Sequence, residues 1–107
     1  MNTIDLIADD WKSVLDFYND LLRAVGAPPG HGRSVDAVVD SFVWGDINRI
    51  NPPLKIRIFS SNSLTKDIAD EIALVSRAVE DSIEEFWRQK GEGLKITFEV
   101  NQRQSNI

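Results

Sequence analysis

Two aspartates four residues apart, Asp36 and Asp40, are the strongest candidates for chemistry in this sequence. On a helix this spacing places both carboxylates on one face, where they repel each other mildly. The stretch from Ser34 to Asn48 contains a third aspartate, Asp46, and no lysine or arginine. Three interpretations are open: the acid and base of an active site, an acidic surface aimed at a basic pocket of another molecule, or a solvated helix face.

The other groups that could do chemistry are isolated or scattered. The single histidine, His31, lies among glycines and prolines, where a surface or turn role is expected. The segment from Gly30 to Ser34 lacks the spacing and the lysine of a phosphate-binding loop, and no serine lies in a nucleophile elbow. Two later acidic runs are expected to be solvated helix faces rather than metal sites: Asp67, Asp70 and Glu71, and then Glu80, Asp81, Glu84 and Glu85. No cofactor and no metal is expected.

Composition indicates one globular domain. The chain has 107 residues, of which 42% are hydrophobic and 27% are charged, a balance typical of a folded domain rather than a disordered chain. Because there is no cysteine, disulfides, thiolate metal sites and thiol catalysis are excluded. We expect a domain over residues 1–100 and a flexible polar tail over residues 101–107.

Charge and hydropathy narrow the expected partners and location. The net charge of −5 makes direct nucleic-acid binding unfavourable, since phosphate contacts need lysine and arginine. The same charge suits a basic partner. No signal peptide and no transmembrane segment is evident, so a cytoplasmic protein is expected.

The first half of the chain is expected to form a strand and two helices. Residues 3–7 suit a short strand. A helix then follows from Trp11, with Asp9 or Asp10 as its N-cap, and it ends at Gly26. Its apolar residues have the spacing of one helix face: 11, 14, 15, 18, 21, 22 and 25. After the glycine–proline loop, Ser34 caps a second, short helix that ends near Trp44.

The second half of the chain is expected to form a strand, a helical segment and a last strand. Residues 54–59 and 94–100 alternate apolar and polar side chains, which is typical of strands. Residues 64–90 suit one long helix, or two helices joined near Ser76. Helices between strands imply parallel pairing. The predicted fold is therefore α/β, a three-stranded parallel sheet with three to four helices covering one face and the other face partly exposed to water.

The loop and the second helix resemble the signature of the barstar family. In that family a proline, an aromatic pair, a glycine, a charged residue and Asn-Leu-Asp-Ala-Leu-Trp-Asp follow one another. The matching positions here are Pro28 or Pro29, Gly32, Arg33, Val35, Asp36-Ala37, Val38 and Asp40. The similarity extends to the strand after Pro53 and to the closing turn and strand over residues 90–97, so that it covers nearly the whole chain.

The resemblance implies a fold and a function. Barstar-like proteins have a three-stranded parallel sheet with helices packed on it. They inhibit ribonucleases stoichiometrically inside the producing cell and are not enzymes. The loop and second helix occlude the active site, where two aspartates, matched here by Asp36 and Asp40, meet basic residues. It implies a basic ribonuclease or toxin domain as partner, and a chain that is monomeric when free. The expected contact residues are His31, Arg33, Asp36, Val39, Asp40 and Trp44.

Several positions depart from the family pattern. Gly30 and His31 replace the aromatic pair, and Ser34 replaces the asparagine. Val39 replaces the tryptophan, although Trp44 could supply an aromatic contact from a shifted position. In the late helix Arg88 falls where the family has an acidic interface residue, with Glu84 and Glu85 one turn earlier. These departures keep a second hypothesis open, a barstar-fold binding module with a non-nuclease partner. A small hydrolase using Asp36 and Asp40 is the third.

Overall fold

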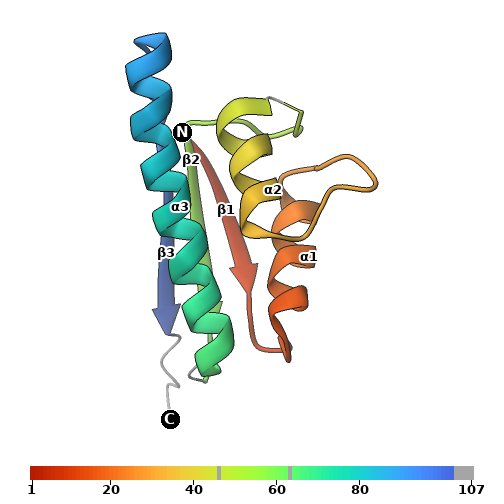
Figure 1. The fold of residues 1–107 in the computed structure, drawn as a ribbon. Helices are drawn as coiled ribbons and strands as arrows, with labels where there is room; N and C mark the ends of the chain where they lie inside the picture. Colours follow the sequence, from red (N-terminus) through yellow and green to blue (C-terminus); the bar gives the residue numbers. More distant parts are fainter. Residues whose placement is uncertain (46, 63, 103–107) are drawn as a thin grey trace.

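Three parallel strands form the sheet onto which the helices pack (Figure 1). The computed structural model describes residues 1–45, 47–62 and 64–102. In chain order the elements are β1 (Asn2–Ile7), α1 (Val14–Ala24), α2 (Val35–Val39), the π-helix η1 (Asp40–Gly45), β2 (Leu54–Ser60), α3 (Lys66–Lys90) and β3 (Ile96–Gln102). The predicted α/β class and the parallel three-stranded sheet are confirmed.

Alternation along each strand divides the sheet into a buried and an exposed face. Ile4 of β1 pairs with Ile56 of β2, which pairs with Phe98 of β3, and this row lies under the helices. Because α1, α2 and α3 lie on one side of the sheet (Figure 1), the opposite face stays open to water, as the strand pattern predicted.

Charged side chains cross the exposed face of the sheet in register. Asp5, Arg57 and Glu99 are paired neighbours on β1, β2 and β3. Arg57 donates two hydrogen bonds to the Asp5 carboxylate, from Nε at 2.7 Å and from Nη2 at 2.8 Å. This contact with the Arg57 guanidinium holds the pKa of Asp5 below its ordinary value. Nζ of Lys55 on β2 lies 3.3 Å from the Glu99 carboxylate, so that charged contacts link all three strands on the side that no helix covers.

The predicted start of the first helix is wrong. α1 begins at Val14 with Ser13 as N-cap, and Asp16 accepts hydrogen bonds from the backbone N–H of Lys12 and of Ser13. Asp9 instead accepts from the backbone N–H and the hydroxyl of Ser61, in the turn after β2. Trp11 is buried although it precedes the helix. Because it continues the apolar pattern of α1 towards the N-terminus, the predicted helix began too early.

The second half of the chain follows the prediction with shifted strand ends. α3 is one continuous helix of 25 residues, so the interruption near Ser76 does not occur. β3 begins at Ile96 and continues to Gln102. Asn101 and Gln102, which were expected in a flexible tail, therefore belong to the sheet, and residues 103–107 lie outside the described part of the chain. No helix in the described part of the chain combines the length and apolar character needed to cross a bilayer.

The buried hydroxyl of Tyr18 gives the packing of α1 on α3 a pH dependence. Tyr18 is 2% exposed and its hydroxyl donates to the carboxylate of Glu71 on α3. Burial and then the nearby Glu71 carboxylate raise the pKa of Tyr18 above its ordinary value of 10.0. A phenol whose pKa is raised by folding stabilises the fold fully below the unfolded pKa, and this contribution is lost as the pH rises through the folded pKa.

We predict that Tyr18→Phe lowers the free energy of unfolding by about 1 kcal/mol at neutral pH, because one buried hydrogen bond is lost. Above pH 10.0 the wild type should lose stability with rising pH more steeply than the variant. Denaturant unfolding at a series of pH values checks both points. Since this is the only tyrosine in the chain, tyrosinate absorbance reports it alone, and ionisation at its ordinary pKa in the folded state would contradict the argument.

Candidate functional site

Asp36 and Asp40 both lie on the exposed side of the second helix. Asp36 is in the first turn of α2 and Asp40 begins η1, so the two form one continuous helical segment. Ser34 caps it as predicted, and its hydroxyl oxygen accepts from the backbone N–H of Ala37 at 3.1 Å. Within the described residues neither aspartate forms an ion pair or a hydrogen bond through its carboxylate. Asp46 lies outside the described residues.

The helix widens into a π-helix from Asp40 onwards. Three consecutive residues, Ser41, Phe42 and Val43, are buried there, whereas an ordinary α-helical stripe buries every third or fourth residue. Gly45 is the last residue of this segment. Glycine is favoured there because a side-chain carbon would lie 2.9 Å from the Asp40 carbonyl oxygen. Such wide turns are found frequently at functional sites, and this one begins at the second aspartate of the acidic pair.

The loop before α2 is fixed at both ends. Gly26 has φ +68°, and a side-chain carbon there would lie 2.7 Å from Cβ of Arg49, so the position requires glycine. The backbone N–H of Arg49 donates to the carbonyl of Gly26, and that of Ile50 donates to the carbonyl of Val25. The connection before β2 therefore holds the start of the loop.

His31 holds the other end of the loop through a partly buried hydrogen-bond network. Its Nδ1 lies 2.7 Å from the carbonyl oxygen of Gly32, and its Nε2 lies 2.7 Å from the hydroxyl of Ser41. Because a carbonyl only accepts, Nδ1 donates to Gly32, and in the neutral imidazole Nε2 then accepts from the Ser41 hydroxyl. Nδ2 of Asn48 donates to the same hydroxyl at 3.3 Å. His31, predicted as a partner contact, thus has both ring nitrogens engaged within the chain.

The remaining predicted contact residues are divided between two sides of the acidic pair. Arg33 precedes α2, and its Nε donates to the side-chain oxygen of Asn19 on α1. Val39 is half-buried against the core. Trp44 lies at the far end of η1 against α3, where its ring centroid is 5.1 Å from that of Phe86. Its indole N–H donates to the hydroxyl of Ser82 at 2.7 Å, and the residue remains 37% exposed.

Arg88 occupies the surface of α3 together with the two glutamates one turn earlier. Its Nη2 lies 2.7 Å from Glu84 and its Nη1 lies 3.5 Å from Glu85. At this position, where the resemblance would place an acidic interface residue, the charge is therefore positive and internally paired. The acidic pair on α2 and η1 has no comparable cation beside it among the described residues.

An active-site interpretation of the aspartates finds no geometric support in the described cavities. A cavity of about 430 Å³ beside the loop is lined by Asp40, His31 and Ser41, but Asp36 does not line it. General acid–base catalysis by the pair would require both carboxylates to face one substrate. The described residues also contain no group of three or more side chains suited to hold a metal ion.

Sequence reasoning missed Asn19, Ser41 and Asn48, which hold the site in place. Each is a common polar residue without a motif, and each contacts a residue at least seven positions away. The sequence offers one signal: residue 41 lies next to the apolar stripe of the second helix, which indicates burial. This signal does not identify the residue with which Ser41 forms a hydrogen bond.

Comparison with known proteins leaves the family open. The sequence matches none of the protein-family models with which it was compared, and the comparison with curated proteins gives no relative.

We predict that Ser41→Ala lowers the free energy of unfolding by about 1–3 kcal/mol, because it removes a hydrogen-bond partner from the buried Asn48 amide and from the half-buried His31 ring. Thermal or denaturant unfolding measures the change. Ser76→Ala is the matched control, since this half-buried serine on α3 forms no side-chain hydrogen bond within the described residues. Equal stability of both variants would show that the network contributes nothing.

Proposed function

We propose that this chain is a stoichiometric protein inhibitor of a ribonuclease, of the barstar type, which acts in the cytoplasm by occluding the enzyme's active site. The observation that carries the proposal is the pair of exposed, unpaired carboxylates on α2 and η1, Asp36 and Asp40. Such a pair gives the free protein little stability, because like charges repel at this spacing. A positively charged partner would offset this repulsion between the two carboxylates.

The chemistry of a ribonuclease active site matches these carboxylates. An enzyme that cleaves RNA holds substrate phosphates with arginine and lysine side chains. Carboxylates placed at the phosphate positions accept the same charge-assisted hydrogen bonds. The net charge of −5 would also speed the encounter with a basic enzyme.

The rigidity of the segment supports an inhibitory role. The network of His31, Ser41 and Asn48 and the N-cap of Ser34 hold the acidic pair before any partner arrives. A surface that is already ordered loses less conformational entropy on binding, so more of the contact energy appears as affinity.

A binding module with a non-nuclease partner is the second candidate. It is favoured by the internal role of His31, because both ring nitrogens are engaged and the loop has no phenylalanine, tyrosine or tryptophan in place of the family's pair. A guanine base in an enzyme pocket would then meet only the imidazole of His31 where the family presents two aromatic rings. Trp44, at the other end of η1, is an exposed aromatic residue of the second helical segment.

We predict that Asp40→Ala weakens partner binding by about 2–5 kcal/mol, the general range for truncating one member of a charge pair buried at an interface. The same change should alter the free energy of unfolding by less than about 0.5 kcal/mol, since the side chain is exposed and unpaired in the described structure. Calorimetric titration and thermal unfolding measure the two effects. A large fall in melting temperature would make Asp40 a structural residue.

Capture from the native cell extract identifies the partner. Wild-type chain and the Asp36→Ala, Asp40→Ala double variant serve as baits. The Asp10→Ala, Asp81→Ala variant is a control of equal charge change at exposed sites outside α2 and η1. A ribonuclease held by the wild type and the control, lost with the double variant and inhibited at a one-to-one ratio, is the expected result. The same non-nuclease protein on all baits would favour the binding module instead.

A further inference from the structure

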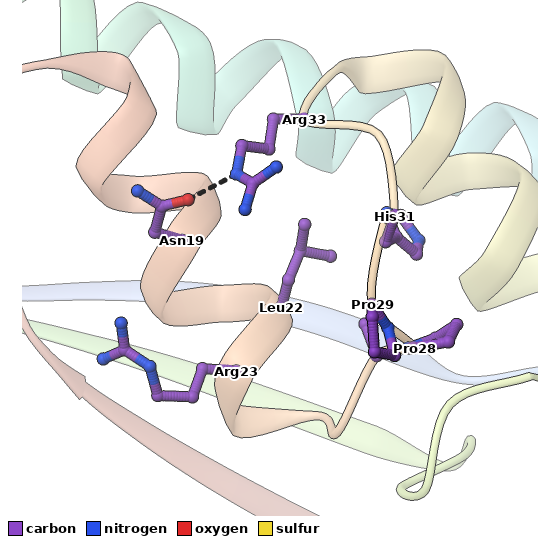
Figure 2. Close-up of a pocket in the computed structure, with 9 residues that line it drawn as sticks. Asn19, Leu22, Arg23, Pro28, Pro29, His31 and Arg33 are labelled. Atoms are coloured by element: carbon purple, nitrogen blue, oxygen red, sulfur yellow. Dashed lines mark hydrogen bonds between the residues drawn. The ribbon is translucent and has the colours of Figure 1, made fainter.

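A cavity of about 390 Å³ lies between α1 and the 27–33 loop, with two arginines among its lining residues (Figure 2). Leu22 lies between the helix and the loop, Pro28 and Pro29 form the opposite wall, and Arg23 and Arg33 supply positive charge. The described lining residues include no aspartate or glutamate. In a chain with 17 acidic and 12 basic residues, this cavity therefore has the opposite sign to the neighbouring acidic pair.

The guanidinium of Arg33 is oriented but only partly used. Its Nε donates to Asn19 of α1 (Figure 2), and its two terminal nitrogens form no hydrogen bond or ion pair within the described residues. The free nitrogens are the pair of donors that a planar carboxylate accepts side by side. Arg23 contributes additional charge, because its contact with Asp20 is long, at 3.3 Å, and its side chain is 78% exposed.

The wall opposite Arg33 is formed before any ligand binds. Pro28 and Pro29 have fixed φ angles, and the backbone N–H of His31 donates to the carbonyl of Pro28 at 3.2 Å. The backbone N–H of Ala27 donates to the carbonyl of Leu22 at 2.9 Å, which ties the wall to α1. The hydrogen bond between His31 and Ser41 fixes the far side of the loop. The cavity is therefore preorganised.

We propose that this cavity binds an aspartate or glutamate side chain of the partner protein, with the carboxylate on the terminal nitrogens of Arg33. The proposal rests on the proposed function, because Arg33 lies three residues before Asp36 and a partner seated on the acidic pair would cover both. The apolar surface of Leu22 and the prolines suits the methylene groups of such a side chain. A polyanionic ligand is disfavoured by the acidic pair, since Asp36 lies three residues from Arg33 and Asp40 lines the adjoining cavity.

The partner's contact surface would then carry a carboxylate at the edge of its basic cleft. Charges of alternating sign on both proteins fix the orientation of the complex and exclude enzymes with a uniformly basic rim. Arg33 would be a specificity residue, while Asp36 and Asp40 would supply the main contact with the cleft.

Titration of the free, isotopically labelled chain with N-acetyl-glutamate amide, followed by NMR, tests the cavity without any partner. We expect saturable shifts of the Arg33 Nε signal and of the amides of Leu22 and Gly30. N-acetyl-glutamine amide, at the same ionic strength, should cause none. Arg33→Gln should weaken the interaction at least about tenfold, and Arg33→Lys should weaken it less, since it keeps the charge and loses the paired donors.

Arg57→Gln on the exposed face of the sheet is the matched control and should leave the titration unchanged, since Arg57 is already paired with Asp5. Shifts that fail to saturate, or that persist in Arg33→Gln, would overturn the proposal. Inorganic phosphate acting on the same signals at lower concentration than the glutamate derivative would also overturn it, in favour of a phosphate ligand. Because this titration needs no ribonuclease, it can fail while the inhibitor function stands, and the reverse also holds.

Discussion

The hydroxyl of Ser41 lies where three segments of chain meet: the loop before α2, η1 and the connection before β2. It donates to His31 of the loop, accepts from Asn48 of the connection before β2, and belongs to η1 itself. A buried polar group must find partners or cost the fold its desolvation energy. This one hydroxyl therefore makes the positions of loop, helix and connection depend on one another, and the charged surface depends on all three.

The second helix combines anchoring and recognition in one short element. A segment of this length is not stable as an isolated helix in water, so its buried side must hold it. Val38, Phe42 and Val43 supply that side, and Trp44 adds a contact with Phe86 of α3. The π-helical turn places those apolar residues together and leaves the carboxylates outside. The buried side of this short segment therefore anchors it, and its exposed side forms the proposed contact surface.

Local patterns predicted most of the fold. The spacing of apolar residues in α3 and the alternation in β2 identify those elements because one face of each is buried over several turns or pleats. The start of α1 was mispredicted because Trp11 is buried without being helical, and because the Asp9 carboxylate is used by Ser61, 52 residues further along the chain. Local sequence contains no information on such a distant partner.

The candidate site was predictable in its charges and not in its contacts. The spacing of Asp36 and Asp40 placed both on one helix face, and Ser34 was identified as the N-cap from its position alone. The internal engagement of His31, the orientation of Arg33 by Asn19 and the π-helical turn all depend on tertiary neighbours. The resemblance to barstar suggested which surface to consider, and the hydrogen bonds show how the chain holds it.

The charged row on the uncovered face of the sheet also bears on how the strands find each other during folding. Strands joined by long crossovers have no tight turn to set their pairing. A slip of β2 by one residue would turn Arg57 towards the helices, where its charge would be buried without a partner. A slip by two residues would keep the faces correct, but it would place Asp5 either opposite Phe59, without a cation, or opposite Lys55, whose single ammonium cannot reproduce the paired hydrogen bonds from Arg57. These solvent-facing charges therefore favour one alignment over its nearest competitors while the chain is still assembling.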